Sequence, residues 1–332
     1  MNIAVIGLGS MGKRRIRLLK QYIKNETEES TTWQIVGIDA TSSRCKECEE
    51  GYSIITYHSL EEALNLEVID CAVVSTPPHT HAKIIKECLE KNIHVFTEIN
   101  LISQGYNENI KLAKEKERIL FLSSTFMYRK EMEYIKKTVQ ESSFAGMYRY
   151  HIGQYLPEWH PWESYKSFFV GRKDTNGCRE IFAIELPWIV DTFGEIKSVY
   201  SVHRKVSNLE IDYDDSYQVL IEHVSGVVGN ISVDVVTPKA GRDLEVWSEG
   251  FHIAWKGTPD TLIRFDNRDR TIEEIFLYQN VEHTEGYNQF VVENAYYDEL
   301  VNFINCVEKR EQPKYSFEKD REILAWIDEI EK

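Results

Sequence analysis

The stretch Ile3-Ala4-Val5-Ile6-Gly7-Leu8-Gly9-Ser10-Met11-Gly12 joins an apolar run to the glycine pattern G-x-G-x-x-G. The run predicts a buried strand, and the residues that follow predict a helix. In such a strand–turn–helix, the first glycine permits the tight turn, the second lets the backbone approach a pyrophosphate, and the third lets the helix pack on the strand. The helix N-terminus attracts phosphates. The pattern therefore predicts a dinucleotide-binding turn built from Gly7, Gly9, Ser10, Met11 and Gly12.

Short apolar runs alternate with amphipathic stretches through the first 122 residues. Continuous apolar strands separated by helices predict a parallel sheet covered on both faces. We therefore expect an α/β Rossmann domain over residues 1–122. The predicted strands are 3–6, 35–38, 54–56, 71–75, 94–96 and 119–122, and the predicted helices are 11–24, 60–64, 79–91 and 104–116.

The remaining residues, 123–332, have a different pattern. Residues 230–235 alternate polar and apolar side chains, which is typical of a half-buried antiparallel strand. We expect an α+β domain with a large, mainly antiparallel sheet and one interrupting helix over 178–193. Two C-terminal helices close the chain and are free to pack back on the first domain. The other predicted strands are 147–155, 196–203, 216–223, 244–248, 252–255, 262–265 and 272–277.

Composition excludes several classes of protein. The 332 residues carry 39 basic and 54 acidic side chains, a net charge of −15, which argues against a nucleic-acid partner. No apolar run is long enough to span a bilayer, and the N-terminus lacks a signal-peptide pattern, so we expect a cytoplasmic protein without a membrane partner. The six cysteines show no framework spacing, and the lone C-x-x-C of Cys45 and Cys48 lacks the further ligands of a zinc site, so no metal is predicted.

Asp39 ends the second predicted strand, 27 residues after Gly12. A carboxylate there would accept hydrogen bonds from the adenosine ribose and repel a 2′-phosphate, which favours NAD over NADP. Four basic residues, Lys13, Arg14, Arg15 and Arg44, could instead serve a 2′-phosphate. We expect them to form a solvated helix face and an adenine-flanking residue.

Two further motifs carry a family resemblance. Ser75-Thr76-Pro77-Pro78-His79-Thr80-His81 precedes a predicted helix, and His94-Val95-Phe96-Thr97-Glu98 follows it. With the crossing segment 126–129, these resemble the Gfo/Idh/MocA oxidoreductase family, and the stretch 154–194 resembles a branch associated with surface-sugar biosynthesis. The resemblance implies a Rossmann domain plus a substrate domain whose open sheet face often forms an oligomer interface. It also implies cofactor contacts from Ser75, Thr76, Pro77, His81, Glu98 and Asn100.

The chain departs from the family at two positions. The family's E-K-P reads Glu98-Ile99-Asn100, so the usual lysine is absent, and the family's H-x-x-D pattern aligns with Ile184 and Pro187. Neither of those side chains can carry a proton. As replacements for proton transfer we predict, in order of preference, Glu180 or Tyr165, then Glu185, His160 and Lys173. For contact with the substrate we predict Trp159 and Trp162, because aromatic faces suit a sugar ring. We also predict Arg129 and Arg172, which lie in the segments that carry the resemblance.

The function expected from the resemblance is an NAD-dependent oxidoreductase of a sugar, amino sugar or nucleotide sugar, working as a homodimer or homotetramer. Two alternatives remain open. One is a dinucleotide-binding protein that has lost catalysis, acting as a sensor or a non-catalytic partner. The other is a redox-neutral lyase or epimerase with tightly held NAD.

Overall fold

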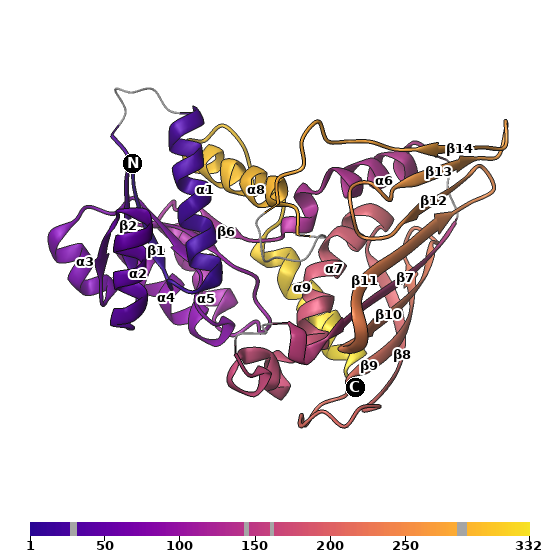
Figure 1. The fold of residues 1–332 in the computed structure, drawn as a ribbon, viewed down its shortest axis with the longest axis horizontal. Coiled ribbons are helices and arrows are strands. Elements are labelled where there is room, and N and C mark those ends of the chain that lie inside the picture. The colour runs from indigo at the N-terminus through magenta and orange to yellow at the C-terminus, as the bar shows by residue number, and fades with distance from the viewer. Residues whose placement is uncertain (27–31, 143–145, 160–162, 284–290) are drawn as a thin grey trace. The chain divides into compact units, whose positions relative to one another are not determined.

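The chain is described by a computed structural model that covers residues 1–26, 32–142, 146–159, 163–283 and 291–332 (Figure 1). It divides into two compact units. The first unit contains Met1–Ser124 and Tyr296–Arg321, and the second contains Thr125–Ala295 and Glu322–Lys332.

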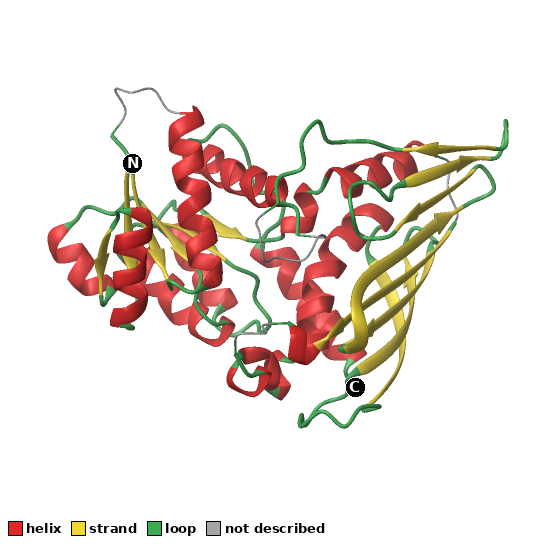
Figure 2. Cartoon of the chain, in the orientation of Figure 1, coloured by secondary structure: helices red, strands yellow, loops and turns green. Residues whose placement is uncertain are grey.

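The first unit is built on a six-stranded parallel sheet in the order β3-β2-β1-β4-β5-β6. Its central strands are buried on both faces, as their continuous apolar sequence predicts. Figure 2 shows these strands enclosed between helices. The strands are β1 Asn2–Ile6, β2 Gln34–Ile38, β3 Ile55–Tyr57, β4 Cys71–Val74, β5 His94–Thr97 and β6 Leu120–Leu122.

Helices follow these strands one after another along the chain. Their bounds are α1 Ser10–Glu26, α2 Ser42–Tyr52, α3 Leu60–Leu66, α4 Pro78–Glu90 and α5 Tyr106–Glu115. Ser59 caps α3, where its side chain accepts a hydrogen bond from the Glu62 amide. Two helices lie near the C-terminus, α8 Glu293–Val307 and α9 Phe317–Ile330. Most of α8 and the start of α9 belong to this first unit.

The second unit contains an eight-stranded sheet in the order β14-β13-β12-β11-β7-β10-β9-β8. All neighbours are antiparallel except β10 and β7, which run parallel. Together the two sheets confirm the predicted fold class. The strands are β7 Met147–Tyr155, β8 Ile196–Arg204, β9 Ser216–His223, β10 Val228–Asp234, β11 Val236–Trp247, β12 Phe251–Trp255, β13 Ile263–Asp266 and β14 Thr271–Glu274.

Helix α7, Gly177–Phe193, packs against one face of this sheet with α6, Lys130–Glu141, beside it (Figure 1). The interrupting helix predicted over 178–193 corresponds to α7, and α6, which precedes the first strand of this sheet, was not predicted. Its buried Met132, Ile135 and Val139 follow helical spacing. Short 3-10 turns occupy Thr125–Tyr128, Leu156–Glu158, Tyr165–Ser167, Phe169–Gly171 and Lys173–Thr175.

All six cysteines are free and buried. Cys45 and Cys48 lie on α2, and Cys45 Sγ donates to the Asp39 backbone oxygen at 3.2 Å. Within the described residues, no helix has the length and apolar character needed to cross a membrane.

Candidate active site

The glycine turn of the first unit has the geometry that the sequence predicts. Gly7 adopts a φ of 94°, and a Cβ at this position would lie 2.7 Å from the Ser75 carbonyl oxygen. A Cβ on Gly12 would lie 1.9 Å from the Gly7 oxygen. Both positions therefore require glycine.

Gly9 differs from its two neighbours, because a Cβ there would meet no atom of the described chain within 4 Å. Helix α1 begins at the next residue, Ser10. The amides of a first helical turn have no carbonyl of the same helix to donate to. An open backbone beside a helix N-terminus fits the pyrophosphate of a dinucleotide.

Asp39 stands immediately after β2, and both its carboxylate oxygens are held in place. Oδ2 accepts from the Leu8 amide at 2.8 Å, and Oδ1 accepts from the Thr41 amide at 2.8 Å. Burial alone would raise the pKa of Asp39, but these hydrogen bonds and the nearby Arg44 guanidinium hold the pKa below its usual range. The carboxylate is therefore ionised and fixed beside the glycine turn.

The turns that follow β4 and β5 are tied together by His81, which lies on α4. Its Nε2 lies 2.6 Å from the Thr76 backbone oxygen, and its Nδ1 lies 2.6 Å from Asn100 Oδ1. Burial lowers the pKa of His81, which favours a neutral ring. A neutral imidazole that donates from Nε2 to the Thr76 carbonyl accepts at Nδ1, where the Thr97 hydroxyl lies 3.2 Å away, so His81 links the turn after β4 to the end of β5.

Our prediction that Arg14 and Arg15 lie on a solvated helix face was wrong. The Arg15 side chain is buried, and its guanidinium contacts Glu98 at 2.6 and 2.9 Å and Glu299 at 2.8 Å. Arg14 is also buried, with its guanidinium 4.5 Å from the centroid of the Tyr296 ring. Arg15 and Glu299 are 284 positions apart in the sequence. The sequence of helix α1 therefore could not predict that Arg15 is buried against Glu299.

Glu98, which we predict to contact the cofactor, thus holds Arg15 with both carboxylate oxygens and accepts a 3.4 Å contact from Ser75 Oγ. Its neighbour Ile99 is partly exposed. The contact of Glu98 with a cofactor stays a prediction.

In the second unit, α7 carries Glu180 at its first full turn. One of its carboxylate oxygens, Oε2, is buried and has no hydrogen-bond partner in the described part of the chain. Burial raises the pKa of Glu180 to about 8. Ile184 follows four residues later and Pro187 seven residues later, so the three positions lie along one stripe of the helix.

Glu185 lies about 140° around α7 from Glu180. Its carboxylate is buried and accepts hydrogen bonds from Tyr150 Oη at 2.9 Å, Trp188 Nε1 at 2.7 Å and Arg242 Nε at 2.8 Å. With three donors around it, Glu185 is held as a structural anchor, and of the two carboxylates Glu180 suits proton transfer better.

The other predicted site residues of this unit differ in burial and in the residues they contact. Arg129 is buried and pairs with Glu131, whereas Arg172 is exposed and pairs with Asp174 at 3.0 Å. The Tyr165 hydroxyl accepts from the Glu210 amide at 3.3 Å. Trp159 is partly exposed and packs beside Gly177. His160 and Trp162 lie outside the described residues.

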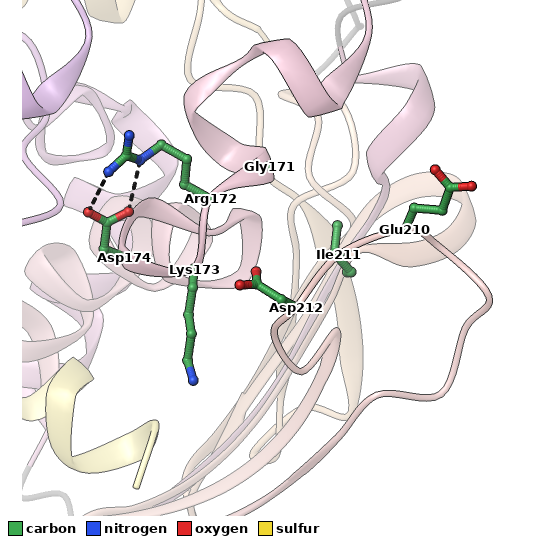
Figure 3. A pocket seen from close by; sticks show the side chains of 7 residues that line it. All are labelled: Gly171, Arg172, Lys173, Asp174, Glu210, Ile211 and Asp212. Atoms are coloured by element: carbon green, nitrogen blue, oxygen red, sulfur yellow. Dashed lines mark hydrogen bonds and ion pairs between the residues drawn. The ribbon is translucent and has the colours of Figure 1, made fainter.

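Lys173 lines an open hollow of about 520 Å³ with Gly171, Arg172, Asp174, Glu210, Ile211 and Asp212. Figure 3 shows Lys173 directed away from the Arg172–Asp174 pair. Tyr165 does not line this hollow, but its hydroxyl contacts the amide of Glu210, which does.

Sequence reasoning missed Arg242, although a signal was present. In Arg242-Asp243-Leu244-Glu245-Val246, Leu244 and Val246 are buried, and Arg242 shares their phase on β11. A charged residue in the buried phase of a strand indicates a paired or functional side chain.

The first 124 residues match the model of an oxidoreductase family described as having an NAD-binding Rossmann fold, GFO_IDH_MocA. The match confirms the resemblance predicted from the glycine turn and the Ser75–His81 and His94–Glu98 motifs, and it confirms NAD as the cofactor class.

Known proteins resemble this NAD-binding domain and the whole fold to different extents. Inositol 2-dehydrogenase of Renibacterium salmoninarum is 30% identical over 98 residues, which cover 30% of this chain and only 28% of that protein. The WlbA dehydrogenase of Chromobacterium violaceum, solved with NADH and UDP-GlcNAcA, has a TM-score of 0.77 and 15% identity, covering 99% of this chain and 92% of that one. A levoglucosan dehydrogenase complex with NADH has a TM-score of 0.82 and 16% identity, covering 100% and 95%. At these identities the solved structures establish the shared fold.

Proposed function

We propose that the protein is an NAD-dependent oxidoreductase that acts on a sugar, amino sugar or nucleotide sugar. The observation that carries the proposal is the glycine turn, in which Gly9 leaves its backbone open beside the start of α1 while Asp39 is fixed next to it. The substrate class is supported by the solved neighbours, whose names include a levoglucosan dehydrogenase and a dehydrogenase bound to UDP-GlcNAcA.

The cofactor would supply the hydride chemistry at its nicotinamide ring. The chain must bind it, orient it and exchange a proton with the substrate oxygen. The turn of Gly7, Gly9 and Gly12 holds the phosphates, and Asp39 binds the adenosine ribose. His81 fixes the two turns at the carboxyl edge of the sheet.

Glu180 is our choice for the proton-transfer group, because it combines an unpartnered buried oxygen with a place on the stripe of α7 that carries Ile184 and Pro187. When a substrate alcohol is oxidised, the ionised Glu180 carboxylate takes the hydroxyl proton. When a carbonyl is reduced, the protonated carboxyl returns it. A pKa of about 8 leaves both forms accessible near neutral pH.

The test is a kinetic comparison with Glu180→Gln. Loss of a general acid or base costs about 10²–10⁴-fold in turnover, and NAD binding should stay unchanged. In the unmodified enzyme, alcohol oxidation should rise with pH through about 8 and carbonyl reduction should fall there, because only the ionised form accepts a proton and only the protonated form donates one. The variant should lose both pH dependences.

Asp191→Asn is the matched control, since this third carboxylate of α7 already pairs with Lys136 at 2.6 Å. The panel also includes Tyr165→Phe, Lys173→Met, Glu185→Gln and His160→Asn. Full activity in Glu180→Gln would reject the assignment of this residue, and loss in another variant would name its replacement.

A binding protein without catalysis is the second candidate, favoured by Ile99 and Ile184 at the family's catalytic positions. It predicts that NAD(H) binds while none of a panel of sugars and nucleotide sugars is oxidised or reduced. In that case the Glu180→Gln change would alter ligand affinity alone.

A further inference from the structure

A buried ion cluster in the first unit joins helix α1, the end of β5 and the C-terminal helix α8. Arg15 binds the two carboxylate oxygens of Glu98 through Nε at 2.6 Å and through one terminal nitrogen at 2.9 Å, and that terminal nitrogen also binds Glu299 at 2.8 Å. The side chains of Arg15 and Glu299 are fully buried, and that of Glu98 is 11% exposed. Arg15 therefore bridges a carboxylate at the parallel sheet and a carboxylate of α8.

Glu299 is held in one orientation within this cluster. Its Oε1 accepts from the Ser124 amide at 2.7 Å and from the Ser123 hydroxyl at 3.0 Å, while its Oε2 faces Arg15. Burial raises the pKa of Glu299, and Arg15 and the Ser124 amide oppose this change because donors favour the ionised carboxylate. The Arg15 guanidinium carbon lies 4.4 Å from the centroid of the Phe96 ring, which limits the plane of the cation.

Glu98 connects the cluster to the edge of the sheet where a dinucleotide binds. In the strand order β3-β2-β1-β4-β5-β6, the direction of the crossovers reverses between β1 and β4, and ligands of such sheets bind outside the carboxyl ends of the strands at this point. Gly7 follows β1, and a Cβ on it would lie 2.7 Å from the carbonyl oxygen of Ser75, which follows β4. Ser75 Oγ in turn lies 3.4 Å from Glu98 Oε1. Ser75 therefore links the Glu98 carboxylate to the glycine turn.

The two halves of the parallel sheet divide the cofactor between them. A fold of this kind consists of two mononucleotide-binding halves. The half formed by β1, β2 and β3 carries Asp39, which we expect to bind the adenosine ribose. The half formed by β4, β5 and β6 carries Ser75 and Glu98 at its carboxyl ends. A shift of Glu98 should therefore disturb the nicotinamide half of the cofactor and spare the adenosine half.

We propose that Glu299 is a positioning residue of the cofactor site, which acts through Arg15 to hold Glu98 for the nicotinamide half of NAD. This inference rests on the cofactor binding in the proposed function. It assigns part of the site to α8, which lies outside the residues 1–124 that match the family model. Without the Glu299 carboxylate, the buried guanidinium and Glu98 are free to shift together from the orientation that Glu299 imposes.

The experiment measures the affinity of the full-length protein for NAD and for ADP by calorimetry. In Glu299→Gln, the amide brings N–H donors to a place where Arg15 and the Ser124 amide need an acceptor, so the affinity for NAD should fall about tenfold or more. The affinity for ADP, which lacks the nicotinamide half, should stay the same. Glu299→Asp keeps the charge and should lose less of the affinity for NAD.

A double-mutant cycle tests the route through Glu98. Glu98→Gln should also weaken the binding of NAD. The double variant Glu98→Gln with Glu299→Gln should bind NAD no more weakly than Glu98→Gln alone, because the change at Glu299 acts through Glu98. Independent effects would instead multiply, and that result would overturn the inference.

Glu318→Gln is the matched control, since it makes the same substitution in the C-terminal segment of the first unit, where Glu318 pairs with Lys114 of α5 at 2.9 Å. It should keep both affinities. Thermal melting reports the folding of each variant, and if Glu299→Gln does not fold, a reduced affinity for NAD with an unchanged affinity for ADP in Glu299→Asp decides.

An unchanged affinity for NAD in the Glu299 variants, or an equal loss of affinity for NAD and ADP, would overturn the inference. Either result together with turnover of a sugar would leave the proposed function standing. A loss confined to NAD, in a protein that turns over none of the sugars, would support the inference and reject the proposed enzyme activity.

Discussion

Asp39 is the side chain that we predict to select the cofactor. Its carboxylate accepts hydrogen bonds from the Leu8 and Thr41 amides, and we expect it to contact the adenosine ribose of the dinucleotide. Its depressed pKa means that it carries a full negative charge at neutral pH.

We predict that NAD(H) binds more tightly than NADP(H) and that Asp39→Ala narrows the difference, because the charge opposing a 2′-phosphate is removed. Calorimetry with both dinucleotides measures this difference in affinity. Glu47→Gln is a suitable control, since Glu47 is an exposed carboxylate that pairs with Lys13. Equal affinity for the two dinucleotides in the unmodified protein would contradict the prediction.

Gly9 allows a separate test of the phosphate turn. Since a Cβ at Gly9 meets no described atom within 4 Å, Gly9→Ala should fold with little change in melting temperature. The added methyl group would occupy the side from which the pyrophosphate approaches, so the affinity for NAD should fall by at least about tenfold. Gly51→Ala on α2, where the space is also open, is the control and should leave binding unchanged. Unchanged NAD affinity in Gly9→Ala would show that the phosphates lie elsewhere.

At the level of elements, helix α7 carries two of the residues that we predict for proton transfer, Glu180 and Glu185. It begins at an Asn176 cap, whose side chain accepts from the Arg179 amide. Its C-terminal end is joined to the sheet through His223 of β9. His223 Nδ1 lies 2.7 Å from the Gly194 oxygen, and Nε2 lies 3.0 Å from the Tyr148 hydroxyl.

We predict that this joint loses stability in acid. Burial lowers the pKa of His223, although the Gly194 carbonyl partly offsets the effect. The unfolded chain therefore takes up a proton near the ordinary pKa of about 6.5 while the folded chain does not, and the free energy of unfolding should fall as pH drops below that value.

Urea denaturation between pH 7.5 and 5 measures the effect. His223→Gln should be less stable at pH 7.5, because it disturbs a buried contact, and should show a shallower loss in acid. His58→Gln is the control, because His58 is exposed. An unchanged pH dependence in His223→Gln would show that another group controls acid stability.

For the whole molecule, the side of the second-unit sheet opposite its helices is notable because it exposes large apolar side chains. Tyr200 on β8 and Leu220 on β9 are paired in register and are 68% and 44% exposed, and Met147 on β7 is 48% exposed. Figure 2 shows the helices of this unit on the other side of the sheet. Apolar side chains gathered on one sheet face favour association.

We predict a homodimer or homotetramer that uses this face. Sedimentation at micromolar concentration should give a mass above that of one chain, and Leu220→Lys combined with Tyr200→Glu should shift it toward the monomer. The same substitutions should leave NAD affinity unchanged, since the glycine turn belongs to the first unit. A monomeric unmodified protein would contradict the prediction.

The parallel sheet and the glycine turn could be predicted because their signals are local. Gly7, Gly9 and Gly12 fall within six residues, and each buried strand is one continuous apolar run. The strands of the second sheet were equally visible, since alternation with period two is also a local pattern. Helix α6 was missed although Met132, Ile135 and Val139 had helical spacing.

The sequence by itself thus determined the dinucleotide turn, the two kinds of sheet and the position of Asp39 after its strand. Tertiary structure alone decided which charged side chains are paired. It placed Arg15 against Glu299 across 284 positions and Arg242 against Glu185 across 57, and it left Glu180 Oε2 buried without a partner among the described residues. The physical reason is that a hydrogen bond depends on distance in space, and side chains far apart in sequence meet only when helices and strands pack.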